Sequence, residues 1–343
     1  MRSASAPLGA LLTCLIAAAC GGTSETGSSS TTTGGTGGSS TTAATTGAGG
    51  SSGTGGATGS GGATGTGGSS TTTTTTTSGS GGGADACTLD DNTTQTAVAG
   101  PTGCHVLDRD TSACDAARTA QGLGGFWLEF SCRVTLTKTT QNGAEVVKVE
   151  ADGQPDYPSN YFPANNPCHE SYPGGIQNPN QIVAKDRVIA IPLSTTMNAQ
   201  PMMGAIVGIA LNGVPIFGDF AAPGDDIYQE AKTFDRCTGH PQMTGVYHYH
   251  AEPVSLTYDD DRFAGVMRDG YPIYGRKDMD GSYPSLDQYG GHTGVTAHSN
   301  GAPVYHYHVN EQTSTNPQTM GQKQWFLTTG DYRGTPLPCN TCN

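Results

Sequence analysis

Positive charge is scarce in this 343-residue chain, where 16 lysines and arginines face 29 aspartates and glutamates for a net charge of −13. An acidic surface argues against a nucleic-acid partner and against binding to an anionic membrane surface. Tryptophan is also rare: only Trp127 and Trp325 occur, which disfavours an aromatic platform for carbohydrate. The apolar run Leu8–Ala19 is too short to span a bilayer.

Familiar catalytic motifs are missing as well. The region after residue 84 has no Gly-x-Ser-x-Gly nucleophile elbow. The chain has no phosphate-binding glycine loop ahead of a helix and no His-Glu-x-x-His zinc-protease motif. The sequence therefore identifies no reaction, no catalytic residue and no organic cofactor, and it leaves open whether the protein is an enzyme.

The first twenty residues have the pattern of a signal peptide, with Arg2 before the apolar run and small residues after it. Ala17-Ala18-Ala19-Cys20 resembles a bacterial lipobox, in which the cysteine is lipidated. We expect residues 1–20 to be a lipoprotein-type signal peptide. The protein should then be exported and held at the outer cell envelope or cell surface through Cys20, its one membrane contact. Secretion without lipid is the alternative.

A low-complexity segment follows. Residues 21–84 are Gly, Ser, Thr and a few Ala, with Glu25 as the only charge. This composition cannot bury enough apolar surface to offset its chain entropy, so we expect a disordered tether. Residues 85–343 are long enough for one substantial domain or two small ones, and we expect one.

Cysteines mark the second region as a disulfide-stabilised domain. Besides Cys14 and Cys20 the chain has eight: Cys87, Cys104, Cys114, Cys132, Cys168, Cys237, Cys339 and Cys342. An even number in an exported chain predicts disulfides. Cys339 and Cys342 are the one pair close enough in sequence to suggest each other, and the remaining connectivity stays open.

Residues 85–343 read mainly as β structure. Ser112–Gln121 predicts one short helix, capped by Ser112. Apolar alternation over Phe126–Lys138, then Asn142-Gly143 and Val146–Glu150, predicts a hairpin. Residues 151–180 read as a long loop. Arg187–Leu193 and Gln324–Thr328 predict further strands.

An internal duplication organises the second half of this domain. Gly208–Gly218 matches Gly265–Gly275, and each segment reads as a strand, an Asn-Gly or Asp-Gly turn, and a second strand. A variable insert follows, and then Val-Tyr-His-Tyr-His at 246–250 and again at 304–308. We expect two halves, about 205–252 and 262–310, that pack as a pseudo-symmetric β core.

Six of the nine histidines fall into two trios with the same spacing, a histidine eight residues ahead of a His-x-His pair. The trios are His240, His248 and His250, and His298, His306 and His308. On a strand the paired histidines share one face and the tyrosines the other. Three imidazoles suit copper(II) or zinc with one coordination position open. The trios either bind one ion each or share one pocket, with Glu252 and Asp235 as candidate supporting groups.

Two weaker features lie in the second insert. His292 has no partner at the shared spacing, so it is either an extra ligand or a polar turn residue. Asp278-Met279-Asp280-Gly281-Ser282 resembles part of a calcium loop, but the closing glutamate is missing. An acidic turn is the simpler interpretation, which makes calcium the lesser candidate.

These repeated motifs resemble the YHYH family, which is named after the tetrapeptide at Tyr247–His250 and Tyr305–His308. The resemblance implies an exported domain and brings no settled activity with it. The function expected from the sequence is a surface-tethered lipoprotein that binds a transition metal. The alternatives are a noncatalytic surface or adhesion module with structural histidines, and a metal-dependent hydrolase or oxidoreductase. The sequence does not identify a protein or glycan partner.

Overall fold

The computed structural model describes residue 87 and residues 93–99, 102–172, 175–222, 225–340 and 342. All of these residues belong to one unit, Ser78–Asn343. The expected signal peptide, the lipidation site Cys20 and the tether at 21–84 lie outside the described residues and stay predictions. Within the described ranges, no helix has both the length and the apolar character needed to cross a membrane.

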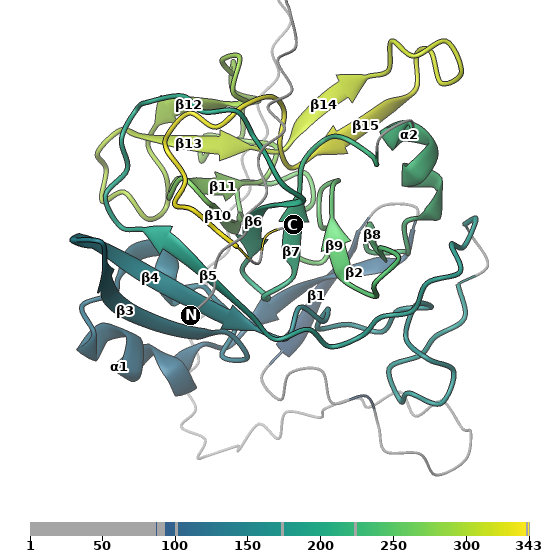
Figure 1. The fold of residues 1–343 in the computed structure, drawn as a ribbon, viewed down its shortest axis with the longest axis horizontal. Coiled ribbons are helices and arrows are strands. Elements are labelled where there is room, and N and C mark those ends of the chain that lie inside the picture. The colour runs from purple at the N-terminus through teal and green to yellow at the C-terminus, as the bar shows by residue number, and fades with distance from the viewer. Residues whose placement is uncertain are drawn as a thin grey trace, which may run out of the picture. The chain divides into compact units, whose positions relative to one another are not determined.

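The N-terminal part supplies a ribbon, a helix and a three-stranded sheet (Figure 1). Its elements are β1 (Thr93–Ala99), β2 (Cys104–Arg109), α1 (Ser112–Ala120), the 3₁₀ helix η1 (Gly125–Leu128), β3 (Thr135–Gln141), β4 (Ala144–Ala151) and β5 (Arg187–Pro192). Strands β1 and β2 pair antiparallel, and β3-β4-β5 form an antiparallel sheet. Asn142 and Gly143 have φ values of 52° and 83°, which confirms the predicted hairpin between β3 and β4.

Two local predictions need correction. The strand expected from Phe126 begins only at Thr135, because the aromatic residues before it curl into η1 and pack together. The Trp127 ring lies 4.9 Å from Phe126 and 5.7 Å from Phe130. Helix α1 does begin at Ser112, but Thr111 holds the N-cap position and makes no side-chain cap. Ser112 instead donates its backbone N–H to the Asp110 carboxylate (2.9 Å).

An eight-stranded sheet holds the two repeats. Its strands are β6 (Ile206–Ala210), β7 (Pro215–Phe217), β8 (Gly239–Pro241), β9 (Tyr247–Tyr249), β10 (Phe263–Met267), β11 (Pro272–Tyr274), β12 (Gly291–Gly294) and β13 (Val304–His308). Their order is β12-β13-β11-β10-β6-β7-β9-β8. Outward from the central antiparallel β10–β6 pair, β11, β13 and β12 on one side correspond to β7, β9 and β8 on the other. The predicted duplication is thus a pseudo-symmetric sheet.

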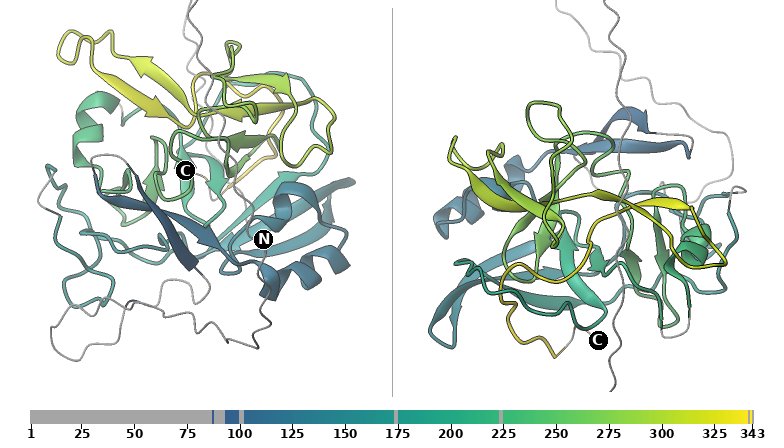
Figure 2. Two further views of the ribbon diagram at one scale, coloured as in Figure 1. Left: turned by 180° about the vertical axis from the view of Figure 1, so that it is seen from behind. Right: turned by 90° about the horizontal axis from the view of Figure 1, so that it is seen from above.

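The remaining elements lie around this sheet. The short helix α2 (Ile227–Glu230) and the 3₁₀ helix η2 (Ala231–Thr233) precede β8, and β14 (Asn310–Thr313) pairs with β15 (Lys323–Phe326). The β14–β15 hairpin and the β3-β4-β5 sheet lie at opposite sides of the eight-stranded sheet in two views (Figures 1 and 2). The mainly β fold that the sequence predicts is confirmed.

Four disulfides connect distant segments of the domain. They are Cys87–Cys168, Cys104–Cys237, Cys114–Cys132 and Cys339–Cys342. The last pair is the one that the sequence suggested. Cys104 lies at the start of β2, and Cys237 lies two residues before β8, so this bridge fastens the N-terminal ribbon to the first repeat. Disulfides fit a protein that folds in an oxidising compartment.

The tight turn of each repeat hairpin depends on glycine. Gly213 and Gly270 have φ values of 86° and 91°, a backbone region that residues with a Cβ atom adopt at a cost of about 1–2 kcal/mol. A Cβ atom on Gly213 would lie 2.6 Å from the Ala151 Cβ atom, and one on Gly270 would lie 2.6 Å from the Pro192 carbonyl oxygen. The hairpin turns are thus packed against the ends of β4 and β5.

We expect Gly213→Ala and Gly270→Ala to lower the free energy of unfolding more than Gly143→Ala does. Gly143 has a similar φ of 83°, yet nothing lies within 4 Å of its added Cβ atom. Gly143→Ala should cost about 1 kcal/mol for the backbone alone, and the other two about 1–3 kcal/mol more for overpacking. Denaturant unfolding with intact disulfides measures this, and equal losses at all three positions would contradict the packing argument.

Candidate metal centres

The first cluster of histidines lies at the edge of the sheet formed by β8 and β9. His240 and His248 are directly opposed in this antiparallel pair, and His250 follows β9 on the same face as His248. The Nε2 atom of His248 is 3.1 Å from that of His240 and 3.0 Å from that of His250. Glu230, the last residue of α2, places Oε1 3.4 Å from the His240 Nε2 atom. The three imidazoles are buried.

The other ring nitrogen of each histidine identifies where the proton lies. His248 Nδ1 donates to the Val246 carbonyl oxygen (3.0 Å), and His250 Nδ1 donates to that of Gly218 (2.5 Å). Carbonyl oxygens only accept, so both rings carry their hydrogen on Nδ1.

His240 reaches the same state through a hydroxyl group. Its Nδ1 atom is 2.7 Å from Thr233 Oγ1, whose own hydrogen is donated to the Glu230 carbonyl oxygen (2.8 Å). The Thr233 oxygen therefore accepts from His240. All three Nε2 lone pairs converge on one point, where the facing atoms are other Nε2 atoms and a carboxylate oxygen.

The second cluster repeats this arrangement on β12 and β13. His292 and His306 are directly opposed in the antiparallel pair. The His292 Nε2 atom lies 3.1 Å from that of His306 and 3.2 Å from that of His308. Asp278 Oδ1 is 3.1 Å from His292 Nε2 and 3.4 Å from His308 Nε2. The four ligand atoms of each cluster lie within 4.8 Å of one another.

The contacts of the Nδ1 atoms are also duplicated. His306 donates to the Val304 carbonyl oxygen (3.0 Å), as His248 does to Val246. His308 donates to the Gly275 carbonyl oxygen (2.7 Å), and Gly275 ends the second hairpin as Gly218 ends the first. The backbone of each hairpin thus orients the last histidine of its own repeat.

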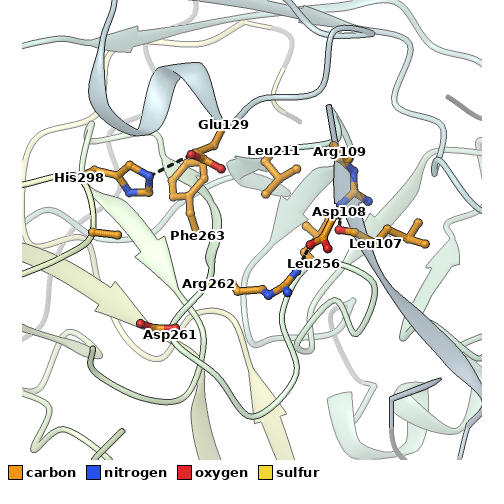
Figure 3. A pocket seen from close by; sticks show the side chains of 11 residues that line it. Leu107, Asp108, Arg109, Glu129, Leu211, Leu256, Asp261, Arg262, Phe263 and His298 are labelled. Carbon is orange, nitrogen blue, oxygen red and sulfur yellow. Dashed lines mark hydrogen bonds and ion pairs between the residues drawn. The ribbon is translucent and has the colours of Figure 1, made fainter. Parts of the chain in front are cut away.

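The structure does not bring His298 into either cluster. Its Nε2 atom faces Glu129 Oε1 at 3.3 Å, and its Nδ1 atom lies 2.9 Å from the Tyr274 hydroxyl. Figure 3 shows the His298 and Glu129 side chains together at a separate pocket. The equal spacing of His240 and His298 in the sequence is therefore a coincidence, and the trio of His298, His306 and His308 is not assembled.

His292 occupies the place that the shared spacing predicted for His298. A signal for this exists in the sequence: Asp235-x-x-x-Gly239-His240 matches Asp287-x-x-x-Gly291-His292. In both loops the aspartate N–H donates to the glycine carbonyl oxygen at 2.8 Å. The loop between β12 and β13 is longer than that between β8 and β9, which changes the spacing along the chain and leaves the cross-strand pairing intact.

Each tyrosine of the two motifs points to the opposite face, as predicted. Tyr247 donates to Asp235 (2.7 Å), and Tyr305 donates to Asp287 (3.0 Å). The second tyrosine of each motif contacts its hairpin turn: the Asn212 amide donates to the Tyr249 hydroxyl (3.1 Å), and Tyr307 donates to Asp269 (2.6 Å). These bonds fix the orientation of both strands.

Comparison with known proteins agrees with this structure. The family model described as YHYH protein matches residues 187–289, which contain β5, the first cluster and Asp278. The chain carries a YHYH-family domain. Comparisons with curated proteins and with solved structures found no match.

Five imidazoles of the YHYH domain, those of His240, His248, His250, His306 and His308, have lowered pKa values because they are buried. Burial lowers the pKa of His250 and of His308 to about 4. It lowers the pKa of His240 and His248 well below the ordinary value, with the neighbouring imidazoles adding to the effect. Neutral imidazole is the form that binds metal ions.

The two candidate supporting groups of the YHYH domain lie away from the imidazole clusters. Asp235 holds Tyr247 on the other face of the sheet. Glu252 is buried and accepts hydrogen bonds from Thr257 (2.8 Å) and Arg276 (2.7 Å). The carboxylates that do face the imidazoles are Glu230 and Asp278, one from the insert of each repeat.

Tyr307→Phe should lower the free energy of unfolding by about 2–3 kcal/mol, because the buried Asp269 carboxylate loses a donor. The Arg333 N–H, which donates to the Tyr307 hydroxyl (2.7 Å), loses its acceptor as well. Tyr283→Phe is the matched control: Tyr283 also donates to an aspartate at 2.6 Å, but the partner Asp259 is at the surface.

The control should cost less than about 0.5 kcal/mol. Denaturant unfolding of both variants gives the two values. Similar losses in the two variants would show that the tyrosine face is not what fixes the YHYH strand.

Proposed function

We propose that the protein is a surface-tethered lipoprotein whose YHYH domain binds two transition-metal ions, one in each repeat. The observation that carries this proposal is the first cluster. Three Nε2 atoms without hydrogens face one another at 3.0 and 3.1 Å across buried space. Lone pairs at this distance repel unless a cation lies between them, and hydrogen bonds among these atoms are excluded by the Nδ1 contacts.

The spacing of the ligand atoms fits a small metal ion. Ligands about 2.0–2.1 Å from a tetrahedral zinc ion lie roughly 3.3–3.4 Å apart. The separations in the first cluster, 3.0, 3.1 and 3.4 Å, are close to this value. Three neutral imidazoles and one carboxylate suit Zn(II) or Cu(II) better than Cu(I), which prefers sulfur ligands.

The histidines of a purely structural motif would satisfy both ring nitrogens with protein partners. His298 does this, since both of its nitrogens face other side chains. The histidines of the first cluster satisfy only Nδ1: the His240 Nε2 atom faces Glu230 at 3.4 Å, but without a hydrogen it cannot donate to the carboxylate. This difference supports metal binding over an adhesion module with structural histidines. Export through the signal peptide and anchoring through Cys20 belong to the same proposal and rest on the sequence.

The full chain should bind two ions of zinc or copper after dialysis against a mixture of copper, zinc, manganese and calcium. The double variants His248→Ala/His250→Ala and His306→Ala/His308→Ala should each lose one ion, because each removes two of three imidazoles from one cluster. Elemental analysis by mass spectrometry counts the ions per chain.

The matched pair His292→Ala and His298→Ala separates the two possible trios. His292→Ala should weaken the second ion by at least tenfold, and His298→Ala should leave both ions in place. Loss of an ion in His298→Ala alone would overturn the second cluster as described. Absence of bound metal in the unaltered chain would overturn the proposed function and favour structural histidines.

A further inference from the structure

A cavity of about 510 Å³ lies beside the second repeat. Aromatic side chains form much of its wall, among them Phe126, Trp127, Tyr271 and Tyr305, and Tyr274 and His298 add polar atoms. We call it the aromatic cavity. Its volume is in the range of small-molecule sites, which combine apolar walls with a few placed polar groups. None of the described side chains that line it is an aspartate, glutamate, lysine or arginine, so it suits a neutral ligand.

Two polar residues of the lining, Tyr274 and His298, belong to a hydrogen-bonded chain. The Glu129 carboxylate only accepts hydrogen bonds, so it accepts the His298 Nε2–H (3.3 Å), and this bond lowers the pKa of Glu129. His298 Nδ1 then has a lone pair and accepts from the Tyr274 hydroxyl (2.9 Å). With its hydrogen committed to His298, the Tyr274 oxygen can only accept: one lone pair takes the hydrogen bond from the Thr296 side chain, and the other is left for a ligand.

Glu129 and His298 line a neighbouring pocket of about 350 Å³, which Figure 3 shows. Asp108 and Arg262 pair in that pocket, so its lining is charged, whereas that of the aromatic cavity is not. His298 stands between the two spaces. The carboxylate that fixes the His298 tautomer is thus on one side, and the hydroxyl that His298 orients is on the other.

The first repeat lacks this chain. Phe217 holds the position of Tyr274 at the end of the equivalent strand, β7, and its ring stacks on His248 at 3.9 Å. The short connection at 242–246 has no histidine, whereas the longer one at 295–303 carries His298. The first repeat forms the same strands and a histidine cluster with a phenylalanine at this position and no histidine in its connection. Neither Tyr274 nor His298 is therefore needed to build the sheet.

We propose that the aromatic cavity binds a small, neutral, planar aromatic molecule that carries one hydroxyl or amine donor, with the Tyr274 oxygen accepting from that donor. Aromatic walls favour stacked and edge-to-face contacts with a flat ring. The acceptor state of Tyr274 selects a donor over a bare hydrocarbon. This site uses none of the six cluster histidines and goes beyond metal binding, so it stands or fails independently of the bound ions.

Tryptophan fluorescence gives a direct test, because Trp127 lines the cavity and the chain has only one other tryptophan. The full chain with Trp325→Phe is titrated with 4-methylphenol, and separately with toluene, which has no donor. A saturable change is expected with both, and 4-methylphenol should bind about fivefold more tightly, as one net hydrogen bond of about 1 kcal/mol predicts.

Tyr274→Phe introduces the residue that the first repeat has at the equivalent position, Phe217. It should weaken 4-methylphenol binding about fivefold and leave toluene binding unchanged. Tyr283→Phe, which removes a hydroxyl outside the cavity, should change neither. Thr195→Phe, at an exposed position of the lining, should weaken both ligands by partly filling the cavity.

The proposal fails if neither ligand gives a saturable change, or if Thr195→Phe leaves both affinities as they were. Equal affinities of 4-methylphenol and toluene would also overturn it. Melting curves show whether Tyr274→Phe folds. Should Tyr274→Phe not fold, the chain with Tyr274 intact is titrated with 4-methylanisole instead. This ether has no hydrogen-bond donor and should bind like toluene. Binding as tight as that of 4-methylphenol would contradict the role of Tyr274. Repeating the titration with a chelator present separates this result from the metal proposal.

Discussion

The alternation of side chains along β9 and β13 is the constraint on which the two clusters depend. One face of each strand carries tyrosines whose hydroxyls contact polar groups, which are buried for Tyr247, Tyr249 and Tyr307, and the other face carries the imidazoles. Burial raises the pKa of Asp235 and of Asp269, and the hydrogen bonds that Tyr247 and Tyr307 donate to these carboxylates partly offset this rise. A buried carboxylate is costly without such donors. The tyrosine face therefore has a strongly preferred register, and a shift of one residue would exchange it with the imidazole face.

The pseudo-symmetry of the sheet explains why there are two separate clusters. Strands β9 and β13 lie on opposite halves, with β7, β6, β10 and β11 between them. The two trios cannot face one shared pocket across four strands. Each repeat must therefore complete its own cluster, and each does so with a histidine from the neighbouring antiparallel strand and a carboxylate from its insert. The second insert supplies Asp278, so the segment that resembles a calcium loop contributes to the histidine cluster.

The sequence predicts the parts of this structure that local rules determine. Asn212-Gly213 and Asp269-Gly270 form hairpins because their glycines allow positive φ. The alternation of Tyr247–His250 fixes which side chains share a face. His292 could not be found by spacing, because pairing across strands brings it opposite His306, and the loop between them is free to vary in length. Glu230 and Asp278 belong to inserts with no shared pattern, so only the folded chain places them.

The tyrosine–carboxylate contacts also explain why glycine precedes each cluster histidine on the edge strand. A Cβ atom on Gly239 would lie 2.3 Å from the Tyr247 hydroxyl, and one on Gly291 would lie 2.6 Å from that of Tyr305. Each hydroxyl crosses the edge strand at that glycine to reach the aspartate of the loop before it. Because the glycine is next to the histidine, the same crossing that secures the tyrosine sets the position of His240 or His292. The two faces of the strand are thus mechanically linked, and a change that moves a tyrosine also moves an imidazole.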